Sequence, residues 1–220
     1  MRPAALFVAI YLVLSAPGLA AQSDRLPRAL AEALQQRYDR IKDFSADFVH
    51  AYVGGVLRTR VTEGGRLFVK KPGMTRWEYK TPEDKLFVSD GMKIYWYVPA
   101  EKQVTVASMP RDDRATTPVL FLTGKGNLTR DFTVLQGDTP AGLPAGTQSL
   151  KLLPRQAEQD YDWLVLSFDS RTLVLRGLTT TDSQGGTSTF SFINLKENLG
   201  LADKTFEFKI PRGVDIVTNR

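Results

Sequence analysis

The stretch that decides the fold runs from Gly65 to Pro99 and reads GRLFVKKPGMTRWEYKTPEDKLFVSDGMKIYWYVP. It holds four short apolar runs separated by KPG, KTPED and SDGMK, in which Pro, Gly and Asp are typical of turns. Because aromatic and β-branched residues fill the runs, the pattern predicts four antiparallel strands in a meander. The runs are Leu67–Val69, Trp77–Tyr79, Leu86–Val88 and Ile94–Val98.

Aromatic side chains are unusually dense in this stretch. Seven of them fall within 30 residues, which is more ring surface than the core of a thin sheet needs. We therefore interpret the meander as a concave sheet face that holds an apolar guest. The seven are Phe68, Trp77, Tyr79, Phe87, Tyr95, Trp96 and Tyr97.

Two helices are expected beside the strands. Apolar residues recur every three or four positions from Leu26 to Ile41, with charged residues between them, which predicts an amphipathic helix after Ser23 or Asp24. This helix either covers the core or closes a cavity as a lid. A second, short apolar helix is expected after Pro118, and it contains Phe121 and Leu122. It either plugs the sheet or lines a pocket.

The remaining chain reads mainly as strands. Phe44 to Tyr52 alternates like a half-buried strand, and similar runs follow as far as Ile193. The segment from Asn198 to Arg220 reads as a short extended closing segment. In total, the sequence predicts about eleven strands and one long helix. Residues 21–220 contain no internal repeat and no linker that would divide them into two domains. The expected fold is therefore mainly β with helices, in a single domain.

Residues 1–20 have the features of a cleavable signal peptide. Arg2 precedes an apolar run from Ala4 to Leu14, and Gly18-Leu19-Ala20 forms a cleavage site of small residues. The apolar run is too short to span a bilayer. The chain contains no Cys, so disulfides, thiolate metal sites and lipidation at a Cys are excluded. These features predict an exported protein that diffuses in a bacterial periplasm.

Charge and motifs argue against several functions. The formal charge is +5 but is not clustered, so no nucleic-acid partner is expected. No phosphate-binding loop, dinucleotide fingerprint, zinc motif or nucleophile elbow occurs. His50 is the only histidine and lacks a second metal ligand of its type. We therefore expect no catalytic residue, no metal and no cofactor.

The order of several blocks resembles a known family. FSADF at Phe44–Phe48 precedes GRLFVKKPGMTRWEY, then VSDGMKIYWYVP, TPVLFL and, near the C-terminus, FEFKIPRGVD. Each block is weak alone, but their order resembles the periplasmic outer-membrane lipoprotein carriers, the LolA family. The resemblance extends from about Leu26 to Ile216.

The resemblance implies an incomplete antiparallel β-barrel of eleven strands with an α-helical lid over a hydrophobic cavity. Members of this family receive the acyl chains of lipoproteins from an inner-membrane ABC transporter and pass them to an outer-membrane receptor, without a cofactor. We expect a monomer. The cavity candidates are Trp77, Tyr79, Phe87, Tyr95, Tyr97, Phe121 and Leu122.

One position departs from the family pattern. The family commonly has Arg before the Pro of the VKKPG block, where it helps to hold the lid closed, and here this residue is Lys71. Lysine keeps the charge but lacks the planar guanidinium fork. We therefore expect Lys71 to act as a weaker or differently timed latch for the lid.

Three other functions stay open from the sequence. The first is a binding or sensing protein for a different lipid or glycolipid on the same fold. An esterase-like enzyme acting on an apolar substrate would need a nucleophile in the cavity and would depend on His50. A purely structural module would fill the cavity with its own side chains.

Overall fold

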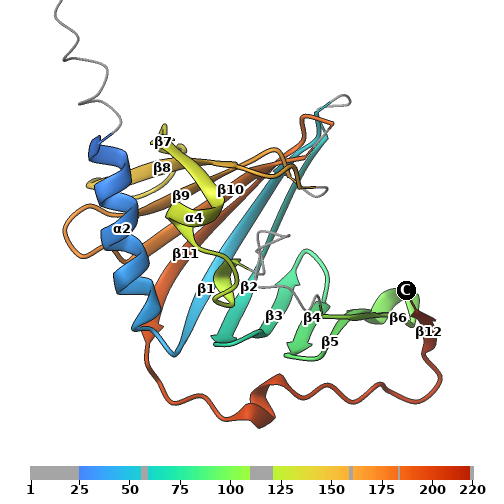
Figure 1. Ribbon diagram of the computed structural model, residues 1–220. Helices are drawn as coiled ribbons and strands as arrows, with labels where there is room; N and C mark the ends of the chain where they lie inside the picture. Colours follow the sequence, from blue (N-terminus) through green and yellow to red (C-terminus); the bar gives the residue numbers. More distant parts are fainter. Residues whose placement is uncertain (1–24, 56–58, 110–120, 159–160, 183, 219–220) are drawn as a thin grey trace, which may run out of the picture.

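The computed structural model describes residues 25–55, 59–109, 121–158, 161–182 and 184–218. Within these ranges the strands form one twelve-stranded sheet in the order β12-β6-β5-β4-β3-β2-β1-β11-β10-β9-β8-β7. The sheet is open, because β12 (Asp215–Thr218) and β7 (Phe132–Gln136) lie at its two edges. The strongly curved sheet partly wraps around its own concave face (Figure 1). The prediction of an incomplete antiparallel barrel is thus confirmed, with one strand more than expected.

The aromatic meander forms as predicted. Its turns contain Gly73 and Gly91, whose φ angles of 77° and 91° favour glycine. Each strand pairs antiparallel with the next along the chain. The strands are β2 (Arg60–Lys70), β3 (Met74–Thr81), β4 (Lys85–Asp90), β5 (Lys93–Val98) and β6 (Gln103–Ser108), with the 3-10 helix η1 (Pro99–Glu101) between the last two.

The long strand β1 (Asp43–Val53) joins the meander to the rest of the sheet. It pairs with β2 on one side and with β11 (Thr187–Glu197) on the other. Its partner β11 comes from the far end of the chain, so the sequence of β1 alone does not reveal this pairing. The other strands of this half are β8 (Thr147–Pro154), β9 (Trp163–Asp169) and β10 (Leu175–Thr181).

Helix α2 (Arg25–Asp39) packs on the concave face with one apolar side, as its periodicity predicts. Ala31 and Leu34 are buried, whereas Leu26 is 73% exposed. The short helix α4 (Leu128–Asp131) lies beside α2 on the same side of the sheet (Figure 1). Phe121 and Leu122 are helical, and the preceding part of the expected short helix lies outside the described residues.

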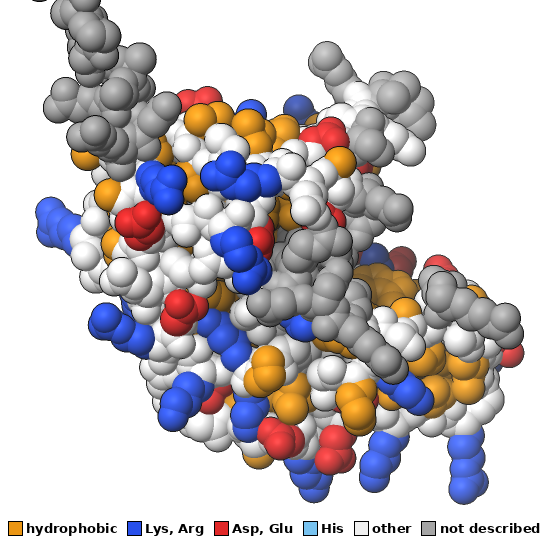
Figure 2. All heavy atoms as spheres, in the orientation of Figure 1, with side chains coloured by type: hydrophobic (Ala, Val, Ile, Leu, Met, Phe, Trp, Pro, Cys, Tyr) orange, Lys and Arg blue, Asp and Glu red, His pale blue; other side chains and the backbone are white. Residues whose placement is uncertain are grey.

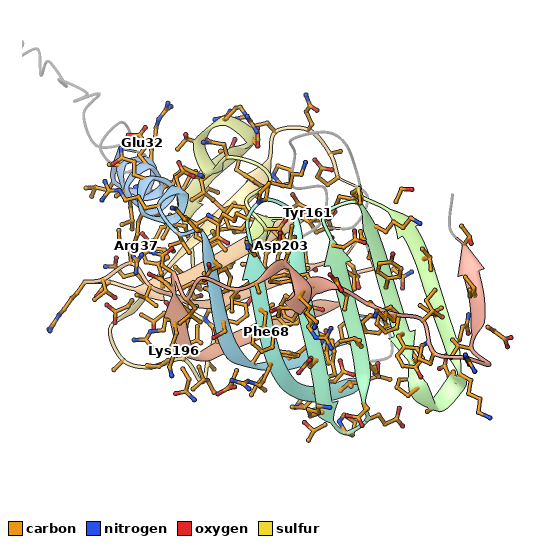
Figure 3. The ribbon with its side chains drawn as sticks, turned by 90° about the horizontal axis from the view of Figure 1, so that it is seen from below. Glu32, Arg37, Phe68, Tyr161, Lys196 and Asp203 are labelled. Carbon is orange, nitrogen blue, oxygen red and sulfur yellow. The ribbon has the colours of Figure 1, made fainter. Side chains whose placement is uncertain are left out.

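The chain after β11 crosses the opposite, convex face of the sheet. Figure 3 shows this segment, with Asp203 labelled, running across the strands of the meander. It contains the 3-10 helix η2 (Asp203–Phe206), whose Phe206 is buried, and it ends as β12, which pairs parallel with β6. The expected closing segment therefore supplies the additional strand of the sheet.

No helix among the described residues is long and apolar enough to cross a membrane. The expected signal peptide, residues 1–20, lies outside the described residues.

Candidate functional site

An apolar pocket lies between α2 and the concave face of the sheet. Its cavity volume is only about 20 Å³, because the helix packs closely over it. Phe121 lines this pocket, whereas Leu122 is fully buried in the core and does not line it. The other apolar lining residues are Leu34, Tyr38, Ile41, Phe44, Leu128, Leu166, Leu173, Leu175 and Leu195.

Tyr38 connects the last turn of α2 to the segment around Phe121. Its ring stacks on Phe121 with centroids 5.7 Å apart, and its hydroxyl donates to the carbonyl oxygen of Leu122. Burial raises the pKa of Tyr38 well above its ordinary value, with a smaller contribution from Glu197. The hydroxyl therefore stays protonated and remains a hydrogen-bond donor.

Lys71 reaches the same residue from the β2–β3 turn. Its Nζ donates to the carbonyl oxygen of Tyr38 and lies 3.4 Å from the centroid of the Tyr38 ring. Burial lowers the pKa of Lys71 to about 8, and the carboxylates of Asp39 and Glu197 oppose this shift. Lys71 thus contacts the helix at the place expected of a latch, and its role in closure stays a prediction.

Arg37 forms a further link from α2 to the sheet. Its Nη2 donates to both carboxylate oxygens of Glu197 on β11, at 3.0 and 2.9 Å. Its Nε donates to the carbonyl oxygen of Thr172 at 2.7 Å. The helical pattern places Arg37 on the polar side of α2, so this contact could not be predicted from the sequence.

A second apolar space lies on the meander half of the concave face. Its volume is about 320 Å³, and it is lined by Trp77, Tyr79, Phe87, Trp96 and Phe190. We call it the aromatic groove. Figure 2 shows hydrophobic side chains gathered at the surface over β3 to β6, while polar and charged ones prevail over the α2 half. Open hydrophobic surface of this kind suits an apolar ligand.

The structure separates the predicted cavity residues into three places. Trp77, Tyr79 and Phe87 line the aromatic groove, and Phe121 lines the pocket under α2. Tyr95 and Tyr97 lie on the convex face, where their rings contact Phe208 at 5.5 and 5.6 Å.

The placement of Tyr95 and Tyr97 in the cavity is therefore wrong, because successive strand residues face opposite sides. Trp96, between them on β5, pairs with Phe87 and faces the groove. Trp96 and Phe190 are the groove residues that the sequence reasoning left out. The alternation of β5 could have indicated Trp96, whereas Phe190 is brought to the groove only by the pairing of β11 with β1.

Polar side chains form a row on the same concave face. His50 Nδ1 lies 3.0 Å from Glu63 Oε2, and Lys85 Nζ donates to Glu63 Oε1 at 2.6 Å. Burial lowers the pKa of His50, so its ring is neutral near pH 7. Burial raises the pKa of Glu63, but the hydrogen bonds from Lys85 and His50 outweigh this and lower it overall. Within the described ranges, no group of three or more His, Cys, Asp or Glu side chains is arranged to hold a metal ion.

Comparisons with known proteins identify the family of this chain. The profile of the family described as "Outer membrane lipoprotein carrier protein LolA" matches residues 39–209. An outer-membrane lipoprotein carrier protein of Chromohalobacter salexigens is 32% identical over 192 residues, covering 85% of this chain and 86% of that protein. One of Methylococcus capsulatus is 28% identical, covering 96% and 97%.

Among solved structures, a LolA superfamily protein from Nitrosomonas europaea covers 81% of this chain and 97% of its own, with 12% identity and a TM-score of 0.45. The family assignment rests on the sequence matches, which extend from the end of α2 through β11 and into the convex-face segment. The chain belongs to the LolA family of outer membrane lipoprotein carrier proteins.

Proposed function

We propose that this chain binds the acyl chains of lipoproteins on its concave face and carries them through the periplasm. The observation that supports this most directly is the closed apolar pocket under α2 beside the open aromatic groove. In the described state the pocket under α2 has too little room for an acyl chain, so a chain enters this pocket only when α2 moves away from the sheet. Its lining then becomes available to hydrocarbon.

The closure of α2 is suited to reversible binding. Burying one methylene is worth roughly 0.8 kcal/mol, so a fully buried chain of about fifteen would gain ~12 kcal/mol and leave slowly. When α2 closes over Leu34, Tyr38 and Phe121, the protein buries its own apolar surface. Closure therefore competes with the cargo and favours its release.

The polar contacts of α2 set how readily it opens. In its last turn, the carbonyl oxygen of Tyr38 accepts a hydrogen bond from Lys71, and Arg37 donates to Glu197 on β11. A partner that competes for these groups would shift the helix toward the open state. We propose that an inner-membrane ABC transporter loads the carrier, an outer-membrane receptor unloads it, and the carrier acts as a monomer after removal of residues 1–20.

A release assay tests the carrier function. Purified residues 21–220 are added to Gram-negative spheroplasts that synthesise a labelled triacylated lipoprotein. We expect the lipoprotein to leave the membrane in a soluble one-to-one complex. If nothing is released while the protein still binds a fluorescent fatty acid, the cargo is another lipid and the carrier proposal is wrong.

A pair of neighbouring variants controls this assay. Phe87→Glu places a charge in the aromatic groove, so it should reduce release strongly. Leu86→Glu changes the preceding residue of β4, which pairs with Tyr97 on the convex face. This variant should release nearly as much as the unmodified chain. Equal loss in both variants would indicate unfolding rather than a binding surface.

One observation favours a second candidate, hydrolysis of an apolar ester. Ser188 Oγ lies 3.3 Å from His50 Nε2, and His50 in turn contacts Glu63, which is the order of a nucleophile, a base and an orienting acid. Turnover of a long-chain p-nitrophenyl ester that is lost in Ser188→Ala would establish it. Because the family consists of carrier proteins, we favour binding without turnover.

A further inference from the structure

The residues of the polar row on the concave face come from four strands. His50 on β1 contacts Ser188 on β11 at 3.3 Å and Glu63 on β2 at 3.0 Å. Lys85 on β4 extends past β3 to reach Glu63 at 2.6 Å. Placing charged groups on a largely apolar face costs free energy, so the row requires a reason beyond packing.

The row borders the aromatic groove directly. The ring of His50 stacks on Phe190, with centroids 4.1 Å apart, and Phe190 lines the groove. Lys85 is the strand partner of Tyr79 and stands two residues before Phe87, so it shares their face. A ligand that lies along the rings therefore meets Lys85 at one end.

Unused hydrogen-bond donors gather at this border. An ammonium group has three N–H donors, and within the described residues Lys85 uses one of them, on Glu63. Its side chain is 25% exposed, so a ligand can reach it. An acceptor oxygen of a ligand in the aromatic groove can therefore bind Lys85 Nζ.

The charges of the polar row favour a neutral acceptor oxygen on the ligand over an anionic one. Lys85 and Glu63 cancel one another, and burial keeps His50 neutral near pH 7. An anionic carboxylate or phosphate would lie close to the Glu63 carboxylate, whereas a neutral carbonyl oxygen would not be repelled. The chemistry therefore fits an ester or amide better than an acidic headgroup.

We propose that Lys85 and the aromatic groove form a subsite for a neutral acyl ester or amide. The carbonyl oxygen accepts a hydrogen bond from Lys85 Nζ, and the hydrocarbon lies along Trp77, Tyr79, Phe87, Trp96 and Phe190. This inference rests on the proposed lipid-binding function and adds to it the position of the ligand's polar end.

A competition assay with residues 21–220 tests the subsite. Methyl myristate, myristate and tetradecane each displace a fluorescent hydrocarbon probe, and their affinities are compared between the unmodified chain and Lys85→Met. Methionine keeps an unbranched side chain but removes the donors. We expect Lys85→Met to weaken the ester about tenfold, which corresponds to about 1.4 kcal/mol, and to leave the alkane unchanged. The unmodified chain should bind the ester more tightly than myristate.

Two further variants separate the subsite from general effects. Lys80→Met removes an exposed lysine on the neighbouring strand and should change neither affinity. Lys85→Met combined with Glu63→Gln leaves no unpaired carboxylate, so it guards against misfolding and should show the same selective loss of ester affinity.

The outcomes distinguish this inference from the proposed function. Failure of the unmodified chain to bind any of the three competitors would contradict lipid binding itself. Binding of all three with no selective effect of Lys85→Met would overturn only the subsite. Tighter binding of myristate than of its ester, or hydrolysis of the ester by Ser188, would also overturn it.

Discussion

Lys71 connects the β2–β3 turn to helix α2. Its ammonium group contacts both the ring and the carbonyl oxygen of Tyr38. Unlike a guanidinium, its ammonium can lose its proton within an accessible pH range, because burial lowers its pKa to about 8. Closure of α2 in this chain is therefore expected to depend on pH.

The direction of this dependence follows from proton binding. When α2 opens, the pKa of Lys71 returns toward its ordinary 10.5, so the open form binds more protons between pH 8 and 10.5. Raising the pH through this range favours the closed form, and the exchange of a fluorescent fatty acid should slow. Lys71→Arg stays charged throughout and should remove the dependence. An unchanged pH profile in Lys71→Arg, or unchanged affinity and release in Lys71→Ala, would exclude the latch.

The three tryptophans report which face of the sheet a ligand touches. Trp77 and Trp96 line the aromatic groove. Trp163 on β9 precedes the buried Leu164, so it faces the other side of the sheet, where Lys151 lies over its ring at 4.9 Å. A brominated acyl chain should quench the fluorescence of Trp77 and Trp96 but not that of Trp163. Single-tryptophan variants provide the measurement, and quenching of Trp163 alone would place the ligand on the convex face.

At the scale of elements, α2 contributes to stability through its buried side. Leu34 is 5% exposed and packs over the pocket, whereas Leu26 on the same helix is 73% exposed. Leu34→Ala should lower the free energy of unfolding by about 2–5 kcal/mol, unless α2 detaches without global unfolding. Leu26→Ala should change it by less than about 0.5 kcal/mol. Urea denaturation measures both, and equal effects would mean that α2 is not closed in solution.

Local detachment of α2 can be separated from global unfolding. Hydrogen exchange in Leu34→Ala would then rise in α2 alone, while the amides of β1 and β11 keep their protection. Such a result would support a lid that moves independently of the sheet.

A buried carboxylate anchors the start of the convex-face segment. Asp43 is 4% exposed, and it accepts backbone hydrogen bonds from Leu199, Gly200 and Leu201 at 2.6, 3.1 and 3.2 Å. Asp43→Asn should destabilise the protein by about 1–3 kcal/mol, because the amide replaces an acceptor oxygen with a donor. Hydrogen exchange should rise at these three amides first.

Asp47→Asn is the matched control for Asp43. Its carboxylate is 45% exposed and lies 3.6 Å from Arg66, a contact that contributes little in water. If both variants lose the same stability, the anchoring role of Asp43 is wrong.

At the scale of the whole molecule, the open sheet supports two different apolar regions. Helix α2 covers one half closely, and the rings of the aromatic groove stay accessible on the meander half. Under the proposed function, opening of α2 would add its pocket to the apolar surface that the groove already offers to a ligand. The sequence predicted the rings and the amphipathic helix, but not the separation of the apolar surface into two places.

The sequence alone determined the features that depend on residues close together along the chain. Turn residues at fixed spacing predicted β2 to β6, the helical period predicted α2, and the ordered blocks identified the family. These features are local, since each follows from the conformation of a few consecutive residues.

Only the tertiary structure decided which residues meet across the sheet. The pairing of β1 with β11 brings Ser188 and Phe190 to His50, about 140 positions away along the chain. The alternation of β5 puts Tyr95 and Tyr97 outside and Trp96 inside, but which side is inside depends on where α2 packs. Strand partners and sheet faces are fixed by contacts between distant segments, and the pattern of a single strand cannot reveal them.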